Sequence, residues 1–115
     1  MDPSAAYTLY RHKVLAQPPL GDGDGALFAA MRAQDPKANL RVVMGVSRWV
    51  IEKIDAIPGL AKAAHAVDPL QLLTEANAVV NRELQAYRGE SVPEFRARLL
   101  PALEARFREM FGHAV

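Results

Sequence analysis

The apolar residues of this chain recur at steps of three and four over its C-terminal half, the spacing of a helical face. Between residues 69 and 88 the face consists of Leu70, Leu73, Asn77, Val80, Leu84 and Tyr87. Between 92 and 111 it consists of Phe95, Leu99, Leu100, Leu103, Phe107, Met110 and Phe111. No segment shows the strict alternation of a strand. We therefore predict an all-α fold, a single small domain of four to five amphipathic helices.

Residues suited to starting and ending helices flank these runs. The expected starts are Asp24, the pairs Asp35-Pro36 and Asp68-Pro69, and Ser91 with Glu94 three residues later. Gly89 follows one run, and we expect it to end a helix in the left-handed conformation. Pro101 lies inside the last run, where it is expected to kink the helix or split it in two.

The first 23 residues have a different composition. They include the pair Pro18-Pro19 and alternate glycine with aspartate from Gly21 onward, and both patterns break regular structure. We predict that residues 1–23 form an extended N-terminal arm or linker and that residues 24–115 form the helical domain.

The segment from Asp35 to Gly59 allows two interpretations. Its central stretch, M-G-V-S-R-W-V-I-E-K-I, resembles the turn and second helix of helix-turn-helix regulators, with Gly45 in the turn and Ser47 capping the second helix. That resemblance implies burial of Leu40, Met44, Val46, Ile51 and Ile54. It also implies DNA contacts by Arg48, Trp49, Glu52 and Lys53.

The other interpretation is one uninterrupted helix. Arg41 stands four positions before Gly45, where the motif has a small residue because its two helices cross closely there. A continuous helix would place Val42, Val46, Trp49, Val50 and Ile57 on one face. The glycine inside such a helix costs only about 1 kcal/mol, which the packing of Trp49 can offset.

Residues that could carry catalysis or bind a metal are scarce. The chain has no cysteine, and its histidines at 12, 65 and 113 are far apart without carboxylates at ligand spacing. No nucleophile elbow or phosphate-binding glycine pattern is present. We therefore expect neither an enzyme nor a cofactor. The net charge of +1 supplies no overall field that would attract nucleic acid.

These observations favour a non-enzymatic protein–protein interaction module, such as an accessory subunit, adaptor or assembly factor. Its partner is expected to be another protein of unknown identity, or a second copy in a homodimer. The candidate partner-binding residues are the apolar side chains near the two chain ends, Tyr7, Leu9, Tyr10, Phe107 and Phe111.

The alternative is a dimeric helix-turn-helix transcriptional regulator that binds DNA through residues 36–57. Because no N-terminal signal pattern precedes the arm and no apolar run approaches the roughly 20 residues of a membrane span, we expect no membrane association. A cytoplasmic, bacterial protein is the expectation.

Overall fold

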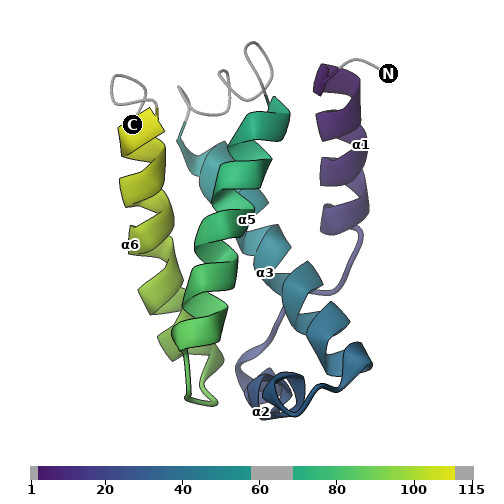
Figure 1. Cartoon of the computed structure of the whole chain (residues 1–115). Coiled ribbons are helices and arrows are strands. Elements are labelled where there is room, and N and C mark those ends of the chain that lie inside the picture. The colour runs from purple at the N-terminus through teal and green to yellow at the C-terminus, as the bar shows by residue number, and fades with distance from the viewer. Residues whose placement is uncertain (1–2, 58–68, 111–115) are drawn as a thin grey trace.

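The computed structural model describes the backbone of residues 3–57 and 69–110. Side chains are described for residues 5–57 and 70–110. Regular structure there is entirely helical, so the all-α prediction is confirmed (Figure 1). The elements are α1 (Pro3–Leu15), the 3₁₀ turn η1 (Asp22–Asp24), α2 (Ala26–Arg32), α3 (Pro36–Ala56), α5 (Pro69–Ala86) and α6 (Val92–Met110).

The helices pack around α3, which passes obliquely behind α5 (Figure 1). Helices α5 and α6 lie side by side and antiparallel, while α1 packs against both α3 and α5. The short α2 packs against α3 at the end of the molecule where α5 turns into α6. Because α1 ends before α5 does, the N-terminal half of α3 emerges beside α5 below the end of α1.

The N-terminal segment is not an extended arm, and that prediction is wrong for residues 3–15. They form α1, whose Tyr7 and Val14 are each 1% exposed within the common core. The prolines and glycines that suggested an extended arm all lie after Leu15, so they interrupt regular structure only beyond the end of α1. Residues 16–21, called the strap below, run from α1 to η1 and bury Leu20.

Helix α3 is continuous from Pro36 to Ala56, so the predicted helix-turn-helix is wrong. Gly45 lies inside this helix and is buried. A Cβ atom added there would lie 2.3 Å from Cγ of Leu20, so the glycine makes room for the strap and forms no turn. Leu40, which the motif would bury, is 62% exposed.

Two of the predicted helix starts are confirmed. The Asp35 carboxylate accepts hydrogen bonds from the backbone N–H groups of Lys37, at 3.0 Å, and Ala38, at 3.4 Å. The Ser91 hydroxyl accepts one from the backbone N–H of Glu94 at 3.2 Å. These bonds satisfy N–H groups that the first turn of a helix leaves without partners.

Two other local predictions are wrong. Asp24 does not cap α2, because its carboxylate instead accepts the N–H of Gly21 at 2.7 Å and closes η1. Gly89 does not adopt a positive φ, and the left-handed residue is Gln34, with φ of 69°, between α2 and α3. The tight reversal between those two helices demands the left-handed conformation there.

The apolar faces of α5 and α6 largely follow the predicted pattern. Of the two expected effects of Pro101, a kink or a split, the split is wrong, because Pro101 lies within a single α6. On α5 the buried side chains are Leu72, Leu73, Ala76, Val79, Val80 and Leu84. Leu70 and Asn77 are exposed, which places both outside the buried stripe. The predicted cap Asp68 lies outside the described residues.

We predict that Gly45→Ala destabilises the fold by about 1 to 3 kcal/mol, although alanine is the better helix former, because its Cβ collides with Leu20. Urea unfolding followed by circular dichroism measures this change. In a Leu20→Ala background the same substitution should be neutral or stabilising, since the collision is gone. An alanine that stabilises the chain with Leu20 present would contradict the packing.

We also predict that Tyr7 destabilises the fold in alkali. Burial, with a further contribution from the Asp55 carboxylate, raises the pKa of Tyr7 above its ordinary 10.0. As pH rises past 10.0, the unfolded chain loses this proton before the folded chain, so the free energy of unfolding falls. Tyr7→Phe should therefore lose less stability than wild type from about pH 9.5 to 11 in urea unfolding. Equal losses in the two proteins would contradict this assignment.

Candidate functional site

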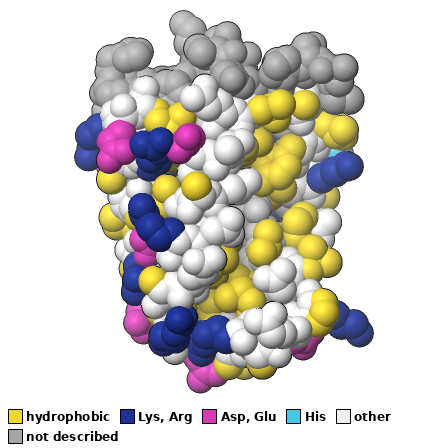
Figure 2. All heavy atoms as spheres, viewed as in Figure 1, with side chains coloured by type: hydrophobic (Ala, Val, Ile, Leu, Met, Phe, Trp, Pro, Cys, Tyr) yellow, Lys and Arg dark blue, Asp and Glu magenta, His cyan; other side chains and the backbone are white. Residues whose placement is uncertain are grey.

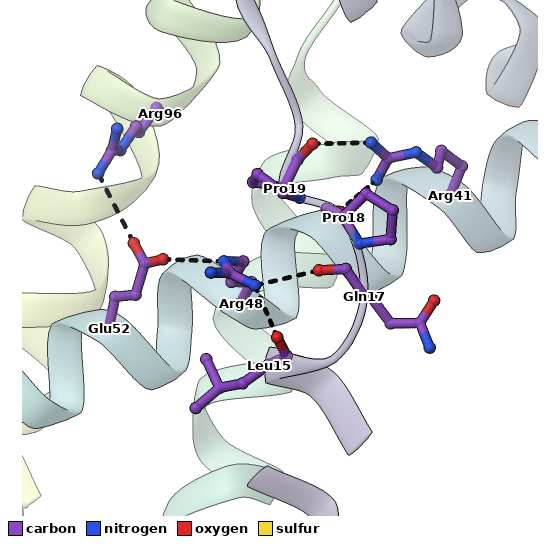
Figure 3. A network of polar contacts seen from close by, with 8 residues as sticks. All are labelled: Leu15, Gln17, Pro18, Pro19, Arg41, Arg48, Glu52 and Arg96. Atoms are coloured by element: carbon purple, nitrogen blue, oxygen red, sulfur yellow. Dashed lines mark hydrogen bonds and ion pairs between the residues drawn. The ribbon is translucent and has the colours of Figure 1, made fainter. Parts of the chain in front are cut away.

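Two arginines of α3 bind the strap through backbone carbonyls (Figure 3). Arg48 Nη1 donates to the carbonyl oxygens of Leu15, at 2.9 Å, and Gln17, at 3.0 Å. Arg41 donates from Nη1 to the carbonyl of Pro18 at 2.9 Å and from Nη2 to that of Pro19 at 2.7 Å. Arg41 and Arg48 lie before and after Gly45 on α3, and together they bind the end of α1 and the part of the strap that precedes Leu20.

The other predicted DNA contacts are likewise engaged within the molecule. Trp49 is 4% exposed, and the Arg96 guanidinium lies 5.6 Å from the centre of its ring. Glu52 forms ion pairs with Arg48 at 3.1 Å and Arg96 at 4.0 Å. The Lys53 ammonium lies 3.1 Å from the Glu104 carboxylate, and this hydrogen bond lowers the pKa of Glu104. The four residues do not form an exposed reading face.

The predicted partner anchors do not form a common surface. Tyr7 is buried and Phe107 is fully buried, so both belong to the core. Tyr10 is half-buried against that core, whereas Leu9 is exposed on α1. Phe111 lies outside the described residues. A docking surface made from these five side chains is therefore not observed.

A different surface feature brings polar side chains together without a described carboxylate. It is a groove of about 580 Å³ between α2, the N-terminal half of α3 and the C-terminal half of α5. It is lined by Met31, Arg32, Asn39, Val43, Asn81, Leu84, Gln85 and Arg88. Its size is within the range of small-molecule and peptide-binding pockets.

The connection between α5 and α6 fixes one end of this groove. The Tyr87 hydroxyl donates to the Ser91 carbonyl and accepts the Ser91 N–H, both at 3.0 Å. The Tyr87 ring contacts Phe28 and Phe95, with each pair of ring centres 5.2 Å apart. Arg88 therefore extends from a connection anchored at both ends in the core.

Helix α2 meets the same connection closely. A Cβ atom on Gly25 would lie 1.7 Å from the Glu90 carbonyl oxygen, so only glycine allows this approach. Arg32, the last residue of α2, donates from Nη1 to the carbonyl oxygen of Gly89 at 3.1 Å. This contact holds the Arg32 guanidinium next to the chain segment that carries Arg88.

The ion pairs of the molecule distinguish these two arginines from the others. Ten arginines occur in the chain, and all lie in the described ranges. Those within 4.0 Å of a described carboxylate are Arg11, Arg41, Arg48, Arg82, Arg96, Arg98, Arg106 and Arg108. Arg32 and Arg88 have no such described partner, and both line the groove.

The hydrogen bonds of the two groove arginines use the same atom. Arg88 donates from Nη1 to the carbonyls of Gln85 and Tyr87, as Arg32 does to Gly89. These bonds satisfy carbonyls at and beyond the end of α5, where a helix has acceptors without donors. The Nε–Nη2 edge of each guanidinium makes no hydrogen bond to a described residue. That edge is able to form two parallel bonds to one carboxylate.

Elsewhere in the described part of the chain, many charged side chains form ion pairs with one another. On the face shown in Figure 2, Lys, Arg, Asp and Glu side chains gather over the left half, where α5 and α6 lie side by side. Pairs such as Arg98–Glu83, at 2.7 Å, and Arg106–Glu75, at 2.6 Å, connect these two helices. Hydrophobic side chains are visible over the right half.

Comparison of the chain with protein-family models, curated proteins and solved structures finds no match. Within residues 3–57 and 69–110, no three His, Asp or Glu side chains gather closely enough to hold a metal ion. None of the helices in these two ranges combines the length and the apolar character needed to cross a membrane.

Proposed function

We propose that this chain is a non-enzymatic helical interaction module and that it binds a partner protein in the groove between α2, α3 and α5. The observation that carries the proposal is the position of the two arginines without a described carboxylate partner. Both line one groove, while the other eight arginines pair with carboxylates elsewhere on the molecule. A partner protein can supply the carboxylates that pair with Arg32 and Arg88.

The neutral lining of the groove supports a protein as the occupant. Asn39, Asn81 and Gln85 carry amides that both donate and accept hydrogen bonds, and none bonds to a described residue. Val43 is 36% exposed beside them. Amides next to apolar side chains suit a polypeptide, which presents backbone polar groups and side chains together.

A second copy of the chain fits this groove poorly. In a two-fold dimer the same patch meets itself, so Arg32 and Arg88 would face the corresponding arginines of the other copy. Like charges brought together across an interface oppose association. We therefore propose a partner different from this chain.

A bulky substitution in the groove tests the proposal without touching the core. Asn81 is exposed on α5 and lines the groove, so Asn81→Trp should fill it and reduce recovery of the protein partner at least about tenfold. Asn77→Trp is the matched control, because Asn77 is exposed one turn earlier on α5 and does not line the groove. Affinity capture from cell lysate, with quantitative mass spectrometry, compares the variants with wild type.

The proposal requires a partner that wild type and Asn77→Trp recover equally and Asn81→Trp loses. Circular dichroism melting of all three proteins checks that the fold is retained. Equal recovery of the same partners by Asn81→Trp would contradict the groove as the docking site. Recovery of nucleic acid in place of protein would contradict the proposed class of partner.

A further inference from the structure

We infer that the groove takes an acidic peptide segment of the partner, with one side-chain carboxylate on each of Arg32 and Arg88. This inference rests on the proposed function, because it names the chemistry of the segment that docks there. Each arginine has one Nε–Nη2 edge without a described hydrogen-bond partner, and each edge matches one carboxylate. Two such edges in one groove favour two acidic side chains.

The internal hydrogen bonds hold the arginines in place before binding. Nη1 of Arg32 is fixed by the Gly89 carbonyl, and Nη1 of Arg88 by the carbonyls of Gln85 and Tyr87. Binding therefore requires less additional ordering of these long side chains, and ordering each one ordinarily costs about 0.5 to 1.5 kcal/mol. The same bonds place positive charge where the end of α5 has partial negative charge, which an incoming carboxylate would otherwise meet.

The charges around the groove agree with an acidic segment. Its lining contains two guanidinium groups and no carboxylate. The neighbouring acidic residue Glu90 is exposed, does not line the groove and forms no ion pair with a described residue. The Asp35 carboxylate is occupied by backbone N–H groups at the start of α3. Little negative charge is therefore present to compete with the ligand.

The neutral side chains that line the groove can contact the rest of the acidic peptide. Asn39 on α3 stands across the groove from Asn81 and Gln85 on α5, so backbone groups of a peptide between these helices find amides on both sides. Met31, Val43 and Leu84 provide apolar contacts for the side chains between the two acidic residues. An inorganic anion would use the arginines and leave these contacts unused.

A nuclear magnetic resonance titration of the full chain tests the inference. The probe is acetyl-Glu-Leu-Leu-Glu-amide, and the signals followed are the Nε–Hε groups of Arg32 and Arg88. We expect both signals to shift and saturate together. Acetyl-Gln-Leu-Leu-Gln-amide, which lacks the charges, should bind at least about tenfold more weakly. Raising salt from about 50 to 500 mM should weaken binding of the acidic probe, because exposed charges are screened.

Matched variants separate bidentate recognition from simple positive charge. Arg32→Lys/Arg88→Lys keeps the charge and loses the planar edges, so it should bind the acidic probe at least about fivefold more weakly. The control Arg82→Lys/Arg108→Lys makes the same chemical change on the exposed faces of α5 and α6, and should bind as wild type does. Equal binding by both variants would overturn the inference.

Three other outcomes would also overturn it. These are equal binding of the uncharged peptide, shifts produced by inorganic phosphate alone, and binding only of acetyl-Gln-Leu-Leu-Gln with a free C-terminal carboxylate. Capture experiments distinguish failure of the acidic-peptide inference from failure of the proposed function.

If Asn81→Trp loses the partner while Arg32→Lys/Arg88→Lys retains it, the groove binds the partner and the acidic-peptide inference is wrong. If the acidic probe binds while Asn81→Trp still captures the partner, the proposed docking site is wrong.

Discussion

The contact between Leu20 and Gly45 is the constraint on which the arrangement of this molecule depends. A side chain at position 45 would collide with the Leu20 side chain of the strap, because even a Cβ atom would lie 2.3 Å from Leu20 Cγ. Next to this contact, Arg48 binds the carbonyls of Leu15 and Gln17, and Arg41 binds those of Pro18 and Pro19. The strap in turn places α1 against α3 and α5 and leads the chain into α2. The buried glycine therefore allows the segment that connects α1 to α2 to pack directly on α3.

The groove is a consequence of that arrangement. Helix α1 covers only part of the length of α5, so the N-terminal half of α3 lies beside the C-terminal end of α5 without α1 over it. Helix α2 lies at the same end of the molecule and completes the groove. The molecule pairs its other arginines with acidic residues, so the two guanidinium groups without a described carboxylate partner both lie at this groove. Arg32 and Arg88 contribute to the fold by binding carbonyls through Nη1, which leaves the Nε–Nη2 edge of each without a described hydrogen-bond partner. Their structural and proposed binding roles use different atoms of the same side chains.

Periodicity was sufficient to predict the helices but not what each side chain contacts. The apolar spacing of residues 92–110 predicted α6, whose Phe95, Leu99, Leu103 and Phe107 are fully buried. Glycine at position 45 was compatible with a turn or with close packing, and only the position of Leu20 decides between them. The groove could not be predicted, because local spacing does not identify unpaired arginines. Arg11 and Arg41 also lack acidic neighbours at helical spacing, yet they pair with Asp55 and Asp24 from other segments.

The continuity of α3 excludes the helix-turn-helix, and this one unbroken helix forms one wall of the groove. Amide hydrogen exchange of the free chain, resolved by nuclear magnetic resonance, tests this claim directly. The account predicts that the amides of Gly45, Val46 and Ser47 exchange as slowly as those of Val42 and Trp49, because all five donate within a buried helix. Fast exchange confined to residues 45–47, between protected flanks, would show a turn and contradict the account.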